Sequence, residues 1–257
     1  QSLGYYKKAY DLFALPASQL IVPIHNVALA ALSRLTKEPD QYKHYYLNTL
    51  SIIAFIGMPL SAILTLTGKD IILLILGSQW TRAGEVFCYF GASIGIMLIQ
   101  NTQGWLHLSL GRPDRWFRWS IFECIIISCC FLIGLPFGIE GVAIAYSITF
   151  YILVAPCLWY AGRPIMLNIT ALISSIWRCF AAALVSGLLS FAFLYKLEKI
   201  AVIFPNLHVL LRLILASTIC LILYLILIVI FYRGLHVIRQ FISIAYQMLP
   251  GKTNIHS

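Results

Sequence analysis

The sequence predicts an all-α membrane protein, a polytopic bundle of transmembrane helices. Of its 257 residues, 61% are hydrophobic and only 11% are charged, whereas soluble domains carry about 25% charged residues. The mean hydropathy is +0.89, so the chain lacks the polar side chains that a water-facing surface needs. Apolar blocks of roughly the 20 residues that cross a bilayer core recur along its length. These observations exclude a soluble globular protein.

Seven apolar blocks follow one another between charged or Pro- and Gly-rich joints. The first, residues 10–35, contains Pro16 and Pro23, so we expect it to be kinked and to face protein or a cavity. The second covers residues 47–66, and the apolar stretch 71–76 after it is too short to span the membrane. The remaining blocks are expected at residues 86–110, 117–135, 139–160, 172–195 and 209–232.

Two further structural elements are predicted, one between the fourth and fifth blocks and one after the last block. The fourth and fifth blocks are separated only by the turn at residues 136–138, which predicts an antiparallel helical hairpin. Apolar residues recur at helical spacing between 237 and 249. That spacing predicts either an amphipathic helix at the membrane surface or a helix that packs against the cytoplasmic loops.

The basic residues indicate an orientation in the membrane. The net charge is +9, but Lys and Arg are scattered between the apolar blocks and form no basic face for nucleic acid. Loops on one side of the seven blocks carry eleven of them and loops on the other side seven. The positive-inside rule therefore predicts a cytoplasmic C-terminus and a cytoplasmic loop at residues 112–118.

No catalytic or metal-binding pattern is present in the sequence. GxSxG, HExxH and Walker A motifs are absent, the six histidines are isolated, and the seven cysteines have no zinc-like spacing. We therefore expect neither an enzyme, nor a cofactor, nor a metal site. Polar residues within the blocks mark either a transport pathway or hydrogen bonds between helices. These candidates are Asp11, His25, Asn26, Gln100, Asn101, Gln103, Glu123 and Arg178.

Glu123 and Arg178 are expected to lie at matching depth in the membrane. Each is about six residues from the estimated cytoplasmic end of its block, or roughly 9 Å at 1.5 Å per residue. A lone charge at this depth is costly. The fourth and sixth blocks are therefore predicted to approach each other and to pair these two side chains. The alternative is that both side chains extend separately to the interface.

Short strings at the ends of the blocks point to a family. They are LGYY at 3–6, ALSRL at 31–35, LGSQW at 76–80, SLGRPDR at 109–115 and GLPFG at 134–138. In content, order and spacing they resemble the second half of bacterial polysaccharide flippases. These are the O-antigen and exopolysaccharide exporters of the multidrug/oligosaccharidyl-lipid/polysaccharide (MOP) superfamily. The resemblance covers about residues 1–160, and two further hydrophobic spans agree beyond it.

The resemblance implies one lobe of a MOP-type transporter followed by two trailing helices. Residues 1–162 would form a five-span bundle like the C-terminal lobe, 163–235 two additional transmembrane helices, and 236–257 a cytoplasmic amphipathic tail. The family has two lobes, so the N-terminal lobe is expected to be missing and the chain to be a fragment. The implied location is the bacterial inner membrane.

The implied cargo is an undecaprenyl-pyrophosphate-linked oligosaccharide for exopolysaccharide, capsule or O-antigen biosynthesis. The implied partners are this lipid-linked oligosaccharide, membrane lipids, the missing N-terminal lobe and the polysaccharide polymerase machinery. A diphosphate needs cations and a sugar needs amides or aromatic rings, while the lipid tail stays outside between helices. The candidate substrate-binding residues are Arg34, Asn101, Gln103, Arg118, Glu123 and Arg178.

Other interpretations stay open at this point. Arg34, Arg118 and Arg178 also suit topology anchors that reach the lipid headgroups. A cation-coupled small-molecule exporter of the same superfamily would use an acidic residue inside the lobe, for which Glu123 is the candidate. An accessory structural membrane protein would tolerate apolar residues at every candidate position.

Overall fold

The computed structural model describes residues 2–201 and 209–232. The described part is helical apart from short connections and contains no strand, which confirms the all-α fold class. The amphipathic helix predicted in the tail 236–257 lies outside the described residues. The helices are α1 (Ser2–Arg34), α2 (Pro39–Leu76), α3 (Thr81–Asn101), α4 (Gln103–Ser109), α5 (Pro113–Gly134), α6 (Gly138–Gly162), α7 (Ile169–Ala201) and α8 (Val209–Tyr232).

Seven of these described helices have at least 21 residues and correspond to the seven apolar blocks. Five described stretches are long and apolar enough to cross a membrane: α2, α3 with α4, the α5–α6 hairpin, α7 and α8. The hairpin counts as one stretch but contains two helices. The chain is therefore a multi-pass membrane protein, while a crossing by α1 stays a prediction.

Helix α2 corrects one prediction. Residues 71–76, expected as a separate short stretch, are the last part of a continuous helix of 38 residues. The charges that divide the hydropathy pattern, Lys69 and Asp70, do not end the helix. Lys69 pairs with Glu85 at 3.0 Å, and Asp70 pairs with Arg212. Pairing offsets the cost of placing charges beside an apolar bundle.

The block predicted at residues 86–110 is divided into α3 and α4. Thr102 stands between the two helices. Its hydroxyl donates to the carbonyl of Ile99 at 2.7 Å and lies 2.8 Å from the hydroxyl of Tyr46 on α2. This break sets the orientation of the short helix α4, which carries several buried polar side chains.

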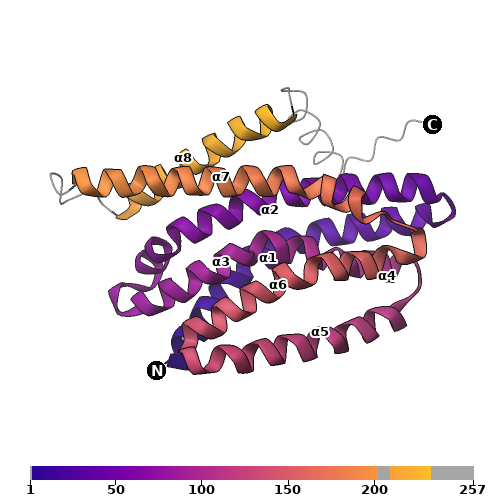
Figure 1. Ribbon diagram of the computed structural model, residues 1–257, viewed down its shortest axis with the longest axis horizontal. Coiled ribbons are helices and arrows are strands. Elements are labelled where there is room, and N and C mark those ends of the chain that lie inside the picture. Colours follow the sequence, from indigo (N-terminus) through magenta and orange to yellow (C-terminus); the bar gives the residue numbers. More distant parts are fainter. Residues whose placement is uncertain (1, 202–208, 233–257) are drawn as a thin grey trace.

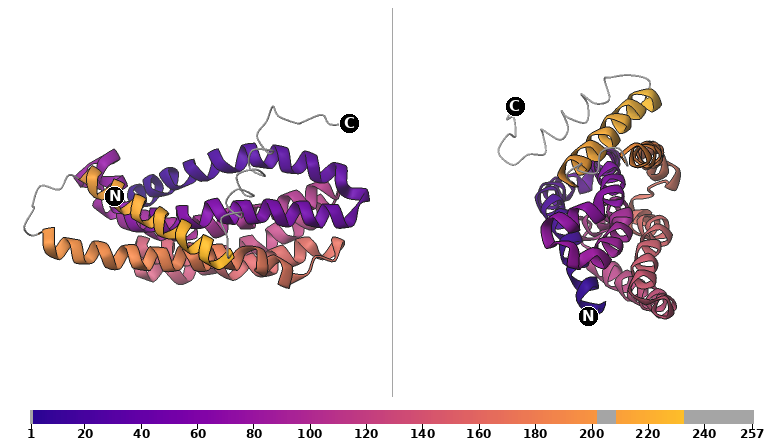
Figure 2. Two further views of the ribbon diagram at one scale, coloured as in Figure 1. Left: turned by 90° about the horizontal axis from the view of Figure 1, so that it is seen from above. Right: turned by 90° about the vertical axis from the view of Figure 1, so that its left-hand side faces the viewer.

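The helices are arranged around the α2–α3 pair (Figure 1). Helix α6 packs on α3, and α5 pairs with α6 at one edge of the bundle. The α5–α6 hairpin is therefore confirmed, with a 3-10 turn at Leu135–Phe137 and a close approach of Gly134 to Gly141. Helices α7 and α8 pack on α2 at the opposite side from α5 (Figures 1 and 2).

Glycines allow α2 and α3 to approach at backbone contact. A Cβ atom at Gly91 would lie 2.9 Å from the backbone carbon of Leu64, whereas one at Gly187 on α7 would meet Ala62 at an ordinary 3.5 Å. We therefore expect Gly91→Ala to destabilise the protein by about 1–3 kcal/mol, the usual cost of overpacking. Gly187→Ala is the matched control and is expected to be neutral or slightly stabilising. Thermal unfolding in detergent measures both, and equal stability of the two variants would contradict the prediction.

Candidate functional site

Three polar side chains meet between the α3–α4 junction and α5. We call Gln100, Gln103 and Glu123 the polar cluster. Gln100 Nε2 donates to Glu123 Oε1 at 2.7 Å, and the side chains of Gln103 and Trp119 also interact with the Glu123 carboxylate. Gln100 and Gln103 are 2% and 6% exposed. Gln103 and Glu123 are both among the site residues predicted from the sequence, and the fold brings them together.

The polar cluster retains unused hydrogen-bonding capacity. Among the described residues, Oε1 of Gln100 and Oε1 of Gln103 are buried without a hydrogen-bond partner. The same holds nearby on α4 for Nε1 of Trp105 and Nε2 of His107. Because buried polar atoms are normally paired, this concentration at one end of the bundle marks a place suited to a polar ligand, an ion or water.

A group of aromatic side chains lies farther along the same helices. Tyr146 on α6 interacts electrostatically with Glu123 and with Tyr10 on α1, and the rings of Tyr10 and Tyr146 lie 6.1 Å apart. Phe131 on α5 lies 5.9 Å from the Tyr146 ring. Helices α1, α5 and α6 therefore contribute to one aromatic group, which Phe131 places about two helical turns along α5 from Glu123.

The other predicted site residues are not part of the polar cluster. Arg34 is exposed at the end of α1, and Asn101 is exposed at the end of α3. Arg118 is exposed on α5 and lies 3.4 Å from Asp114. Of the remaining polar candidates, Asp11 and Asn26 are exposed, and His25 is half-buried with its ring 6.2 Å from that of Trp105.

The predicted pair of Glu123 and Arg178 is wrong. Within the described residues, Glu123 takes its contacts from α3, α4 and its own helix α5, and the ion pairs do not include Arg178. The Arg178 guanidinium instead lies 4.7 Å from the ring centre of Tyr232 on α8. The reason is the packing order, because α6 lies between α5 and α7 (Figures 1 and 2).

The ion pair between Asp70 on α2 and Arg212 on α8 was not predicted from the sequence. Arg212 Nε donates to Asp70 Oδ2 at 2.9 Å, and Nη2 donates to Oδ1. Asp70 is 5% exposed. Arg212 is one of the seven basic residues assigned to the loops on the less basic side of the membrane. An acidic residue inside an apolar helix, with an arginine at the same end of a later span, was the signal that could have identified the pair.

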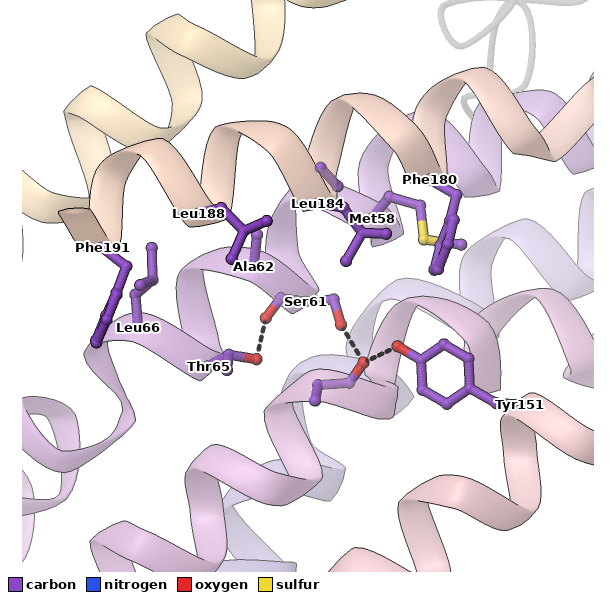
Figure 3. Close-up of a pocket in the computed structure, with 13 residues that line it drawn as sticks. Met58, Ser61, Ala62, Thr65, Leu66, Tyr151, Phe180, Leu184, Leu188 and Phe191 are labelled. Atoms are coloured by element: carbon purple, nitrogen blue, oxygen red, sulfur yellow. Dashed lines mark hydrogen bonds between the residues drawn. The ribbon is translucent and has the colours of Figure 1, made fainter. Parts of the chain in front are cut away.

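An apolar groove runs between α7 and the bundle (Figure 3). Its cavity of about 270 Å³ is lined mainly by apolar side chains of α2 and α7, including Ala62, Leu184 and Leu188. The hydroxyls at its floor are satisfied internally, since Ser61 and Tyr151 both donate to the carbonyl of Ala92 at 2.6 Å. The groove therefore presents an apolar surface.

A second cavity extends the groove along α7. It measures about 180 Å³, lies between α7, α6 and α3, and shares Tyr151 and Phe180 with the first. Together the two cavities follow α7 from Ile169 to Phe191, which is roughly 33 Å at 1.5 Å per residue. That length matches a hydrocarbon core of about 30 Å.

Comparisons with known proteins agree with this architecture. Residues 1–85 match a family described as polysaccharide biosynthesis protein. The chain is 23% identical over 193 residues to the teichuronic acid biosynthesis protein TuaB of Bacillus subtilis, covering 74% of the chain and 40% of the relative. It is 20% identical over 201 residues to the lipopolysaccharide biosynthesis protein WzxC of Escherichia coli, covering 74% of the chain and 39% of the relative.

The fold is also that of a solved flippase. The lipid II flippase MurJ, in an inward closed conformation, matches with a TM-score of 0.62 and 19% identity over 90% of this chain and 47% of that chain. The chain spans about 40% of the length of the curated relatives it matches. The resemblance to polysaccharide biosynthesis proteins is thereby confirmed, and the structural match shows that the fold is shared with a lipid flippase.

Proposed function

We propose that the chain is the C-terminal part of a transporter that flips undecaprenyl-pyrophosphate-linked oligosaccharide across the bacterial inner membrane. The cargo would serve exopolysaccharide, capsule or O-antigen biosynthesis. The names of the relatives, which refer to teichuronic acid and lipopolysaccharide, support this cargo class, and the MurJ-like fold supports transport over catalysis. The observation that carries the proposal is the apolar groove along α7.

The length of the groove favours a long isoprenoid chain. A phospholipid acyl chain reaches about half of the roughly 30 Å core, because each leaflet contributes half of its thickness. The groove follows α7 over about the full thickness. A polyprenyl chain can fill such a groove from one end to the other, whereas an acyl chain would leave part of it empty.

The oligosaccharide diphosphate would use the polar surface on the other side of α6. The polar cluster supplies a carboxylate and amides, and the exposed Asn101 adjoins it in sequence at the end of α3. Arg34 and Arg118 are exposed near helix ends that border α4, and in this proposal they meet the diphosphate at the entrance. Arg178, which lies over the Tyr232 ring, would meet lipid headgroups instead.

The charge bias supports an orientation for this transporter. In the proposal, the C-terminus and the loop at residues 112–118 face the cytoplasm, because the basic residues concentrate on that side. Residues 1–162 act as the lobe, 163–235 as two additional membrane helices and 236–257 as a cytoplasmic tail. An N-terminal lobe completes the transport pathway, and the polymerase machinery receives the cargo.

A pair of tryptophan variants tests the groove. Leu184 and Leu189 are both 50% exposed on α7, but only Leu184 lines the groove. We expect Leu184→Trp in the complete transporter to lower polysaccharide export at least about tenfold. This corresponds to an increase of about 1.4 kcal/mol in the activation free energy of transport. Leu189→Trp is the control and is expected to export normally. Surface polysaccharide is measured at equal protein levels, and equal export by both variants would contradict the proposal.

A labelling experiment distinguishes a polyprenyl lipid from a phospholipid as the ligand of the groove. A photoactivatable polyprenyl diphosphate is expected to label the residues of the groove, with competition by undecaprenyl phosphate and little competition by phospholipid. Labelling that phospholipid suppresses equally well would assign the groove to ordinary membrane lipid and overturn its role in cargo binding.

A cation-coupled small-molecule exporter is the second candidate. The half-buried carboxylate of Glu123, close to the unpaired Oε1 atoms of Gln100 and Gln103, favours it. Such an exporter would lower drug accumulation in cells and would leave surface polysaccharide unchanged on deletion. The flippase predicts the reverse for both measurements.

A further inference from the structure

The ion pair of Asp70 and Arg212 lies at one end of the groove. Asp70 is four residues beyond Leu66 on α2, and Leu66 lies beside Phe191 of α7 at that end of the groove (Figure 3). The pair joins α2 to α8, and α8 lines neither of the two cavities. Its contribution to the groove therefore acts through the packing of helices.

Helix α8 is tied to α2 at two heights. Besides the Asp70–Arg212 pair, the hydroxyl of Tyr224 donates to the backbone carbonyl of Phe55 at 3.0 Å. Fifteen residues separate the two attachment points on α2, or roughly 22 Å along the helix axis. Two attachments at this spacing fix both the position and the tilt of α8 against α2.

Helix α7 packs on both α2 and α8. It makes few contacts with α6, and the groove lies where α7 faces α2 and α6. On its other side, α7 contacts α8 at Ser186, whose Oγ lies 4.0 Å from Cys220 Sγ, and at Trp177, whose ring lies 6.3 Å from that of Phe231. A shift of α8 would therefore disturb one of the two helices on which α7 packs.

We propose that Asp70 and Arg212 are positioning residues for the lipid-binding groove. Their ion pair holds the end of α8 that carries Arg212 on α2. Helix α8 in turn holds α7 at the distance from α2 that keeps the groove open. The inference rests on the proposed function for the identity of the ligand. The positioning role concerns only the packing of α2, α7 and α8.

The two residues of the ion pair also differ in burial, and this difference predicts different effects of the single substitutions. Asp70 is almost fully buried, whereas the Arg212 side chain is 40% exposed. Arg212→Leu would leave a buried carboxylate without its partner, while Asp70→Leu would leave an arginine that can reach the interface. We expect Arg212→Leu to lower the thermal transition more than Asp70→Leu does. The double variant removes both charges and avoids this penalty.

A disulfide across α2 and α7 reports the position of α7. A Cβ atom at Gly187 would lie 3.5 Å from Cβ of Ala62, which is within the roughly 3.5–4.5 Å that a disulfide needs. In the full chain with Ala62→Cys and Gly187→Cys, mild oxidation should join these two positions. Mass spectrometry of the linked peptide follows the rate without removing the native cysteines.

The test compares this rate in two double variants. In Asp70→Leu/Arg212→Leu we expect disulfide formation to slow about threefold or more, a typical size for the coupling of contacting residues, with the thermal transition within about 4 °C of the parent. The control is Lys69→Gln/Glu85→Gln, which removes a neighbouring and more exposed pair and should leave the rate unchanged.

Two results would overturn the inference. One is an unchanged disulfide rate in Asp70→Leu/Arg212→Leu, and the other is an equal slowing in Lys69→Gln/Glu85→Gln. Labelling of the groove by the polyprenyl probe is measured in parallel and is expected to fall with the disulfide rate; labelling that stays at the parent level while the rate falls would also overturn it. Failure of the probe to label the unmodified chain would instead count against the proposed function, while the disulfide rate still decides the positioning role.

Discussion

Expressed by itself in a strain that lacks its own flippase, the chain is expected to leave polysaccharide export unrestored. Alternating access requires two repeats that move against each other around a shared site. The chain spans about 40% of its curated relatives, and in the proposed function it contributes one of the two lobes. The expected effect is therefore complete loss of export and not a graded reduction.

The exposed surface of α5 is suited to contact with a second lobe or with lipid. Of the described residues of α5, only Trp119 and Gly134 are buried, and Glu123 on the same helix is half-buried. A carboxylate at the margin of a lipid-facing helix is costly. A second lobe placed over the surface formed by α1 and α5 would shield it and would close the transport pathway.

The measurement is surface polysaccharide in the complemented strain. An epitope tag shows that the chain reaches the membrane, and a plasmid that carries the strain's native full-length flippase is the positive control. Export restored by the chain alone, at a level similar to the positive control, would show that one lobe is sufficient and would remove the two-lobe mechanism.

Most of the helices could be predicted from hydropathy alone. The described residues 209–232 form the single helix α8, as expected, because an uninterrupted apolar run satisfies its backbone hydrogen bonds in a membrane as a helix. The α5–α6 hairpin followed from its short turn. Helix α2 was predicted too short, because Lys69 and Asp70 look like a loop until their partners on α3 and α8 are in place.

The candidate site could be predicted only in part. Sequence position gives the depth of a residue in the membrane, but it does not give the direction in which the residue faces around the bundle. Gln103 and Glu123 were found because both are polar residues within apolar spans, and they do meet. Arg178 shares the expected depth of Glu123 but lies against α8, since the packing order of the helices is a tertiary property.

The second large effect is expected at Glu123. We expect Glu123→Gln in the complete transporter to reduce export at least about tenfold, or about 1.4 kcal/mol. Glutamine keeps the size of the side chain and can still accept a hydrogen bond from Gln100 Nε2. The substitution therefore removes the negative charge while leaving the packing nearly unchanged. Loss of export would then report a need for the charge itself.

The controls separate a local role from a general one. Glu140→Gln removes an exposed carboxylate at the start of α6 and is expected to export normally. Arg178→Gln removes a guanidinium that lies over Tyr232, and we expect a smaller effect than at Glu123, because the two charges do not meet. Export is measured at equal protein levels for all three variants.

Normal export by Glu123→Gln would remove Glu123 from the site. Equal losses in Glu123→Gln and Arg178→Gln would indicate that the two charges act together in another conformation of the transporter.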